Sequence, residues 1–275
     1  MQAILSILCC ALFPFEPLKA ERVTYDTSDG VKIVADYYAP TTQPDRNKKA
    51  PVAILIHMYP LTRDSWGPLV PSLHEAGFAI LAYDIRGKGE SVEPVSKNLR
   101  AMYGERSTTL FTEAWRDAAG ALKWLSGRPE CDTSHVTVIG ASVGASIAID
   151  FARREPKVKT IVGLSPYMET LGIKTGEHIK DIAKRAIFLL SPDGEYDRIK
   201  DLSLACNCPM KSEHYIGGAA QHGTNLLDEP MYGNQVVQTI VDFCKSALSP
   251  AIASKKPGKD EPANPPATDD VPKKP

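Results

Sequence analysis

The chain has 275 residues, of which 43% are hydrophobic and 24% are charged, and its formal net charge is −1 at pH 7. This length is sufficient for one large domain with a sizeable core, and the composition is ordinary for a globular protein. A nearly neutral chain gives no electrostatic argument for a nucleic-acid partner, which would require a basic surface.

The first 20 residues have the pattern of a secretory signal peptide. Residues 3–13 are nearly all apolar, Pro14 and Pro17 follow, and the small residue Ala20 offers a cleavage site. The apolar run is too short to span a bilayer comfortably. We expect a signal peptide over residues 1–20, a secreted or periplasmic location, and no integral membrane segment in the mature chain. A buried first strand or an interfacial anchor is the alternative.

Strand and helix patterns alternate through the middle of the chain. Continuous apolar runs predict strands buried on both faces, and apolar residues repeating every three or four positions predict amphipathic helices. The expected strands are 22–27, 31–38, 51–57, 78–83, 135–139, 160–164, 186–190 and 213–217. The expected helices are 64–76, 110–125, 145–155 and 235–248. This alternation predicts an α/β fold with a mainly parallel sheet and helices on both faces.

A possible nucleophile follows the strand 135–139. Ser142 lies at the centre of Gly140-Ala141-Ser142-Val143-Gly144, and a helical pattern begins directly afterwards. A strand that breaks on Gly-x-Ser-x-Gly and continues into a helix is a nucleophile elbow, in which the serine hydroxyl is exposed above the sheet. The same spacing also occurs in glycine-rich turns without chemistry, so the strand-turn-helix context carries the interpretation.

The last part of the chain differs in composition. From about Ser249 it consists largely of Lys, Pro, Asp and Ala, with almost no large apolar side chain. Such a segment cannot bury enough surface to offset the entropy of ordering. We predict a disordered tail over residues 249–275, which leaves 21–248 for the folded domain.

Four cysteines remain if the leader is removed. An even number in an exported protein permits disulfides, and three pairings are possible among Cys131, Cys206, Cys208 and Cys244. Cys206-Asn207-Cys208 lacks a second ligand pair at a spacing suited to a metal. Phosphate-binding and dinucleotide-binding glycine motifs are also missing from the sequence. We therefore expect neither a metal nor a cofactor.

Three motifs in this order resemble the α/β-hydrolase family. Residues 57–60, HMYP, follow the third expected strand, where that family has His-Gly-x-Pro. Residues 84–91, DIRGKGES, follow the fourth strand and match D-x-R-G-x-G-x-S, and the elbow follows the fifth. The chain is most similar to small esterases related to dienelactone hydrolases and to serine aminopeptidase-like hydrolases. The resemblance covers about residues 22–248. It implies an eight-stranded α/β-hydrolase fold with Ser142 as the nucleophile.

A serine nucleophile needs a histidine that accepts its proton. Three histidines follow Ser142 in the sequence: His178 in a polar helical stretch, His214 inside a strand, and His222 in a loop after the last strand. The family order is serine, then acid, then histidine, with the histidine in that last loop. The resemblance therefore implies His222 as the catalytic base.

The acid that orients this histidine should follow the strand 186–190. The candidates are Asp193, Glu195 and Asp197. The family pattern Gly-x-x-Asp fits residues 194–197 and predicts Asp197. Asp193 precedes the turn glycine, where an aspartate commonly bonds its own backbone, and is the second candidate.

Two backbone amides are needed to stabilise the oxyanion. The elbow supplies the amide of Val143, and the resemblance implies that of Tyr59. Met58 stands where the family usually has glycine, which leaves the conformation of this loop open. We expect three further polar residues of these motifs to brace loops and not to take part in catalysis: His57, Asp84 and Arg86.

The segment 166–185 is too short for a large lid, which predicts an open site suited to small-molecule or polymeric esters. Serine at the elbow disfavours the chemistries of this fold that need a carboxylate there. The sequence thus predicts a serine hydrolase that cleaves carboxylic esters through an acyl-enzyme. The alternatives are a peptidase or thioesterase with the same mechanism, or a non-catalytic binding protein of this fold.

Overall fold

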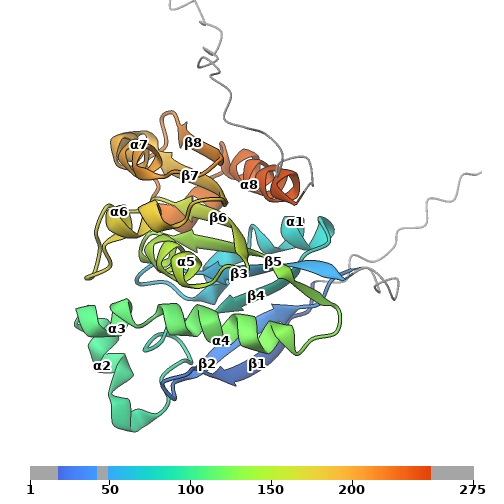
Figure 1. Ribbon diagram of the computed structural model, residues 1–275, viewed down its shortest axis with the longest axis vertical. Helices are drawn as coiled ribbons and strands as arrows, with labels where there is room; N and C mark the ends of the chain where they lie inside the picture. The colour runs from blue at the N-terminus through green and yellow to red at the C-terminus, as the bar shows by residue number, and fades with distance from the viewer. Residues whose placement is uncertain (1–17, 42–48, 249–275) are drawn as a thin grey trace, which may run out of the picture.

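The computed structural model describes residues 18–41 and 49–248 (Figure 1). The predicted tail, and the predicted signal peptide before residue 18, lie outside these residues. The described strands are β1 (Glu21–Asp26), β2 (Lys32–Tyr38), β3 (Ala50–Ile56), β4 (Ala79–Tyr83), β5 (Cys131–Ala141), β6 (Val158–Leu164), β7 (Ala186–Pro192) and β8 (Met210–Ile216). They form one sheet in the order β1-β2-β4-β3-β5-β6-β7-β8.

The sheet is mainly parallel, as predicted. β2 pairs antiparallel with both β1 and β4, and every other neighbouring pair is parallel. The carboxyl ends of β3 to β8 therefore lie along one edge of the sheet, where loops can bring distant residues together. This edge is where ligands bind in open α/β sheets.

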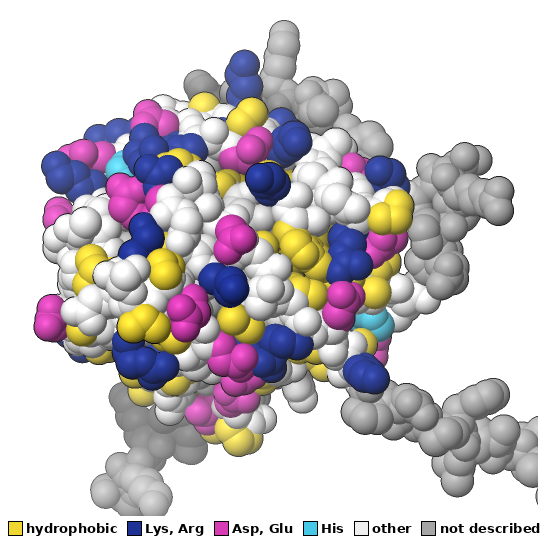
Figure 2. Space-filling view, turned by 90° about the horizontal axis from the view of Figure 1, so that it is seen from below, with side chains coloured by type: hydrophobic (Ala, Val, Ile, Leu, Met, Phe, Trp, Pro, Cys, Tyr) yellow, Lys and Arg dark blue, Asp and Glu magenta, His cyan; other side chains and the backbone are white. Residues whose placement is uncertain are grey.

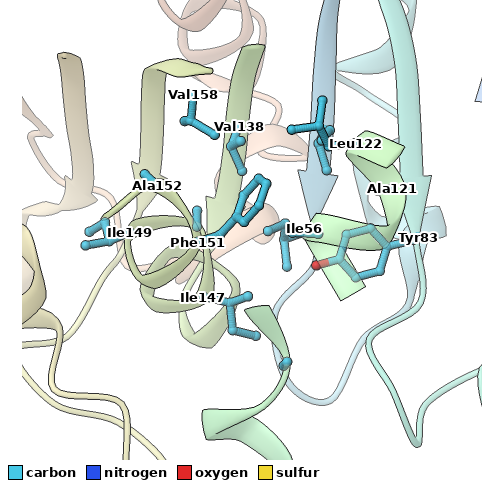
Figure 3. Close-up of a cluster of buried hydrophobic side chains, with 14 of the residues drawn as sticks. Ile56, Tyr83, Ala121, Leu122, Val138, Ile147, Ile149, Phe151, Ala152 and Val158 are labelled. Atoms are coloured by element: carbon cyan, nitrogen blue, oxygen red, sulfur yellow. The ribbon is translucent and has the colours of Figure 1, made fainter. Parts of the chain in front are cut away.

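Helices cover both faces of the sheet. Helices α4 (Trp115–Ser126), α5 (Val143–Arg154) and α7 (Tyr196–Ala205) pack on one face, and α1 (Val70–Glu75) and α8 (Gly233–Ala247) pack on the other (Figure 1). Alternate residues of each central strand point to opposite faces because the side-chain period of a strand is two. Figure 3 shows the first core, where Phe151 and Leu122 from the helices lie among strand residues such as Ile56 and Val138.

Several shorter elements connect these layers. They are α2 (Leu99–Gly104), α3 (Thr108–Thr112) and α6 (Thr175–His178), with 3₁₀ turns η1 (Arg63–Trp66), η2 (Val95–Lys97), η3 (Ile179–Asp181), η4 (Asp193–Glu195) and η5 (Gly223–Leu227). Between β6 and β7 the chain forms only α6 and η3, so the expected absence of a large lid there is confirmed.

Two helix predictions were wrong in their extent, and two helices were not expected. The segment 64–76 breaks into η1 and α1 because Pro68 and Pro71 lack the amide that a continuous helix needs. The segment 110–125 divides into α3 and α4 through a turn of hydrogen bonds between residues three apart, such as Asp117 N to Ala114 O at 3.1 Å. Helices α2 and α7 form in stretches that the sequence pattern left without regular structure.

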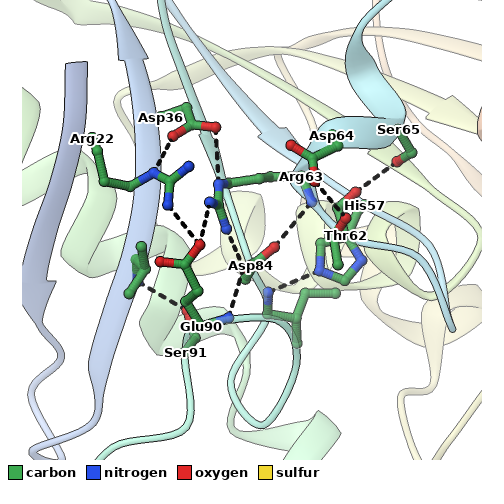
Figure 4. Close-up of polar contacts among 12 residues, drawn as sticks. Arg22, Asp36, His57, Thr62, Arg63, Asp64, Ser65, Asp84, Glu90 and Ser91 are labelled. Atoms are coloured by element: carbon green, nitrogen blue, oxygen red, sulfur yellow. Dashed lines mark hydrogen bonds and ion pairs between the residues drawn. The ribbon is translucent and has the colours of Figure 1, made fainter. Parts of the chain in front are cut away.

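A buried ion cluster ties the loops after β3 and β4 to β2 (Figure 4). The Arg63 guanidinium pairs with Asp84 and, at 2.9 Å, with both Asp36 and Glu90. The side chain of Asp84 is fully buried and that of Arg63 is only 4% exposed. The Asp84 carboxylate also accepts hydrogen bonds from the Arg63 and Glu90 amides, each at 3.0 Å. Asp84 is therefore a bracing residue, as predicted.

Arg86 anchors the same loop to α4 and to the first hairpin. Its guanidinium lies 2.8 Å from the Asp117 carboxylate and 2.8 Å from that of Asp29. Burial raises the pKa of Asp117 to about 6, even though Arg86 acts to lower it. For the less buried Asp29, the hydrogen bonds from Arg86 and Thr27 outweigh desolvation and lower the pKa to about 2. Arg86 thus braces the loop through two carboxylates, as predicted.

The surface carries charges of both signs. Figure 2 shows acidic and basic side chains interspersed on the face that it presents, with apolar residues scattered between them. This mixture agrees with the net charge of −1. None of the helices in residues 18–41 and 49–248 is long and apolar enough to cross a membrane.

We expect the ion cluster to be sensitive to the loss of its central cation. Arg63→Met removes the cation and leaves Asp84 buried without a counter-charge, so the free energy of unfolding should fall by about 3–5 kcal/mol. The matched control is Lys174→Met, which breaks the exposed Lys174–Glu177 pair and should cost less than about 1 kcal/mol. Urea denaturation followed by circular dichroism measures both values. Equal losses in the two variants would contradict a structural role for the cluster.

Candidate active site

Ser142 lies in a strained turn between β5 and α5. Its backbone has φ 53° and ψ −120°, a conformation in which a residue with a side chain is rare. The Ser142 amide donates to Leu164 O at 2.8 Å, which fixes the turn to the end of β6. The residue keeps 9% of its surface exposed, so its hydroxyl is held close to solvent at the edge of the sheet. This geometry is that of a nucleophile elbow.

The elbow depends on two glycines that flank the serine. A Cβ on Gly140 would lie 2.2 Å from the carbonyl oxygen of Gly144, and a Cβ on Gly144 would lie 2.2 Å from that of Ile56. Neither position therefore accepts a side chain. The first turn of α5 packs directly against the backbones of β3 and β5 for this reason.

His222 lies in the loop between β8 and η5, the position expected for it. Its Nδ1 is 2.8 Å from Oε1 of Glu195, and the two residues are 27 positions apart in the chain. Glu195 ends η4, the turn that directly follows β7. The loops after β7 and β8 therefore bring a carboxylate and an imidazole together at the carboxyl edge of the sheet.

Asp197, the acid that the sequence predicts, does not pair with His222, whose carboxylate partner in the structure is Glu195. β7 continues to Pro192, η4 follows without a gap, and α7 begins at Tyr196. Asp197 is consequently already in the first turn of α7, where its carboxylate has no ion-pair partner in the described part of the chain. The Gly-x-x-Asp pattern assumed an extended loop at this point. The second candidate, Asp193, is also not paired with the imidazole.

The Glu195 carboxylate is held in its charged form. Its side chain is 17% exposed, and burial acts to raise its pKa. Hydrogen bonds from His222 and Ser165, together with the positive charges of His222 and Arg198, outweigh this effect and hold the pKa below its usual value. A carboxylate that stays ionised can stabilise a positive charge on the imidazole.

Ser165 links the two loops of this pair and was not singled out from the sequence. It is fully buried at the end of β6 and has a left-handed φ of 52°. Its hydroxyl accepts the amide proton of Gly223 at 3.0 Å, and it also acts to lower the pKa of Glu195. Ser165 thus fixes the residue next to His222 and favours the charged form of the carboxylate.

Met58, the departure from the family pattern, packs beneath the histidine loop. Its side chain is buried, and a Cβ on Gly223 would lie 2.5 Å from its sulfur. Gly223 also has a left-handed φ of 60°. The space that a glycine at position 58 would leave open is therefore filled by the thioether, which supports the loop that carries His222.

The two predicted oxyanion amides are free to bind a substrate atom. Val143 is the first residue of α5, where an amide has no acceptor within the helix. Tyr59 lies in the loop after β3. Within residues 18–41 and 49–248, neither amide donates a hydrogen bond to the protein.

His57 is a structural residue, as expected. Its Nε2 accepts the amide proton of Ile85 at 3.0 Å, so the ring proton is assigned to Nδ1, which donates to Met58 O at 2.9 Å. The ring is fully buried, and burial lowers its pKa to about 4. The neutral imidazole fastens the oxyanion loop to the loop after β4.

Aromatic side chains lie on both sides of these loops. The ring of Tyr59 stacks on Tyr103 of α2 at 5.1 Å between centroids, and the Arg106 guanidinium lies 4.7 Å from its centre. On the other side, the ring of Tyr167 is 5.7 Å from that of His222. The sequence gave no signal for the aromatic contact made by α2.

The cysteines of the domain do not form a metal site. Cys206 and Cys208 are joined in a disulfide, and Cys131 and Cys244 are buried free thiols. Among the described residues, no group of three or more His, Cys, Asp and Glu is arranged to hold a metal ion.

Comparison with known proteins identifies relatives. Residues 11–172 match the family model of acetyl xylan esterase. An uncharacterized protein of Mycobacterium tuberculosis, Rv2307c, is 25% identical over 141 residues, which are 51% of this chain and 43% of that protein. The chain spans about half the length of the curated relatives that it matches.

Solved structures share the fold. The esterase Pf2001 of Pyrococcus furiosus superimposes with a TM-score of 0.65 at 18% identity, over 84% of this chain and 94% of that one. A dienelactone hydrolase of Anabaena variabilis superimposes with a TM-score of 0.66 at 19% identity, over 84% and 99%. The architecture is therefore that of the α/β-hydrolases.

The position of the acid is open to a direct test. Glu195→Gln keeps the size of the side chain but removes the charge that faces His222, so the rate of ester hydrolysis should fall by about three to four orders of magnitude. Asp197→Asn is the matched control two residues away and should retain nearly the full rate. Steady-state kinetics on p-nitrophenyl acetate measures both. If Asp197→Asn lost activity while Glu195→Gln stayed active, the catalytic acid would be Asp197, as the sequence pattern predicts.

Proposed function

The chain belongs to the acetyl xylan esterase family, and we propose that it hydrolyses carboxylic esters with Ser142 as nucleophile, His222 as base and Glu195 as acid. The observation that carries this proposal is the 2.8 Å contact between His222 and Glu195, on two loops at the sheet edge where the Ser142 elbow also lies. Family membership supports hydrolase activity, and the residues of the site supply the mechanism.

The reaction follows from the orientation of His222. Because Nδ1 is bonded to Glu195, Nε2 is the nitrogen left to accept the Ser142 hydroxyl proton. As the proton moves, Ser142 Oγ bonds to the ester carbonyl carbon, and the carbonyl electrons move onto oxygen. The amides of Val143 and Tyr59 donate to this oxyanion. Glu195 stabilises the imidazolium that forms.

The second half of the reaction reverses the proton path. The imidazolium gives its proton to the leaving alcohol as the C–O bond breaks, which leaves an acyl group on Ser142. Water then attacks the acyl carbon while His222 accepts a proton from it. The bond between the acyl carbon and Ser142 Oγ breaks as the imidazolium returns this proton to Oγ, which releases the acid product and free serine. No cofactor is required by any of these steps.

The surroundings of the site suit an exposed or extended substrate. The segment between β6 and β7 forms no large cover, and Tyr167 lies beside His222. Tyr215 of β8 is 47% exposed and packs on Tyr196, the residue after Glu195. These features suit small-molecule or polymeric substrates, and membership of an esterase family favours esters over the peptides or thioesters that the same triad could attack.

Ser142→Ala tests the mechanism. The substitution removes the nucleophile without disturbing the core, so ester turnover should fall by about four to six orders of magnitude while the unfolding midpoint stays unchanged. Ser134→Ala is the control, because Ser134 is an exposed serine near the start of β5, at the opposite end of the strand from the elbow. A fluorophosphonate probe should label the wild type and the control only.

The substrate class needs a separate comparison. We expect a series of p-nitrophenyl esters to be cleaved faster than thioester and aminopeptidase substrates of matched size. Failure of the probe to label the wild type would favour a non-catalytic binding protein. Full activity in Ser142→Ala would remove the proposed nucleophile.

We also propose that the mature protein is exported and begins near Glu21. The apolar leader pattern and the Cys206–Cys208 disulfide both support an oxidising compartment. Mass spectrometry of native protein, unfolded without reductant, should find two free thiols on a chain that starts near Glu21. A chain that starts at Met1 and carries only free thiols would contradict export.

A further inference from the structure

The proposed acid has a second partner besides His222, an arginine. Arg198 Nη2 lies 2.8 Å from Oε1 of Glu195, the same oxygen that His222 Nδ1 approaches at 2.8 Å. Arg198 follows Glu195 by three positions and lies in the first turn of α7, directly after the turn η4 that Glu195 ends. The carboxylate oxygen is therefore shared between the imidazole and a guanidinium.

Arg198 is also fixed by an aromatic ring that touches the histidine. Its guanidinium carbon lies 4.3 Å from the centre of the Tyr167 ring, and that ring is 5.7 Å from the His222 ring. A guanidinium over an aromatic face is attracted by the ring quadrupole. The contacts form a closed circuit through Glu195, Arg198, Tyr167 and His222.

No other charged group of the neighbouring elements pairs with this circuit. In the part of the chain that the structure describes, the ion pairs of Glu195 come from His222 and Arg198 alone. Asp193 and Asp197 flank Glu195 in the chain but pair with neither cation. On β8, the Glu213 carboxylate is engaged by the Ser203 hydroxyl, and at the end of β6 the contact is the neutral hydroxyl of Ser165.

We propose that Arg198 is a positioning residue of the ester hydrolase, which holds the Glu195 carboxylate in place against His222. The proposal rests on the function proposed above. A fixed carboxylate orients the imidazole, as in other serine hydrolases. A guanidinium on the same oxygen opposes a positive charge on the ring by Coulomb repulsion. Both cations and the carboxylate keep some solvent contact, so the effect on the charge balance is moderate.

Arg198→Met tests the proposal because it keeps the apolar stem and removes the charge. On a neutral p-nitrophenyl ester, kcat should fall about tenfold with little change in KM, since one anchor of the acid is lost. The acid limb of the kcat/KM profile should move to higher pH by about half a unit to one unit. Arg198→Lys should restore the position of the limb, but only part of kcat, because an ammonium lacks the planar fork.

Lys200→Met is the matched control, since it removes an exposed cation from the same helix. It should leave kcat, KM and the pH profile unchanged. The protonation of His222 is also followed by NMR titration of its ring protons in wild type and Arg198→Met. This readout does not depend on turnover, and it should show the same upward shift of about half a unit to one unit.

The outcomes are separable. If Arg198→Met leaves both kcat and the His222 titration unchanged while Glu195→Gln is crippled, the inference about Arg198 is wrong and the proposed function stands. A rise in KM confined to anionic esters would make Arg198 a substrate-binding residue and overturn the positioning role. Loss of activity without any shift of the titration, together with a lower free energy of unfolding, would reduce Arg198 to a structural residue. If Ser142→Ala and Glu195→Gln are both silent, the proposed function itself fails.

Discussion

The close approach of α5 to the ends of β3 and β5 is the constraint on which the rest of the site depends. Two glycines make it possible, because a Cβ on Gly140 or Gly144 would lie 2.2 Å from a backbone oxygen. With the helix this near, the single residue between strand and helix that must turn is Ser142, in a left-handed conformation. The strain of that turn, about 1–3 kcal/mol for such conformations, is held by the surrounding sheet. It aims the hydroxyl at the edge where the loops after β7 and β8 meet.

Buried ion pairs, and not apolar packing, fix the loops around this elbow. Arg63 and Arg86 reach into the loops after β3 and β4 and pair there with Asp84 and Asp117, whose side chains are fully buried. Burying such pairs brings little net stability, because desolvation offsets most of the Coulomb attraction. The pairs instead contribute directional hydrogen bonds to the backbone. For example, the Asp84 carboxylate accepts a hydrogen bond from the amide of Arg63. We infer that the polar motif DIRGKGES serves to fix loop geometry near the oxyanion amides.

Much of the architecture was predictable from sequence because the strands are long apolar runs and the elbow has a distinctive pattern. Ser142 and His222 stand where the motif order placed them, at a strand-helix turn and in the loop after β8. The sequence favoured Asp197 over Glu195, the carboxylate that pairs with His222, because three carboxylates lie within five residues of one another and only the start of α7 decides which of them faces the imidazole. The spacing of Ile199 and Leu202 could have indicated that helix, and both are buried. Nothing local in the sequence could have revealed Ser165, whose contacts join residues more than 25 positions away.

The two halves of the site are governed by different physics. The serine half is set by packing: Ser142 is barely exposed, its glycines exclude any side chain, and Met58 fills the space beneath the histidine loop. The acid–base half is fixed by the ion pairs of Glu195 with His222 and Arg198, and these two partners keep about a third of their side-chain surfaces exposed. Packing of the first kind is insensitive to salt and proton concentration, whereas exposed charges respond to both. We therefore expect substitutions of exposed charges on α7 to act on the Glu195–His222 pair without altering how the nucleophile is presented, because the core does not constrain these side chains.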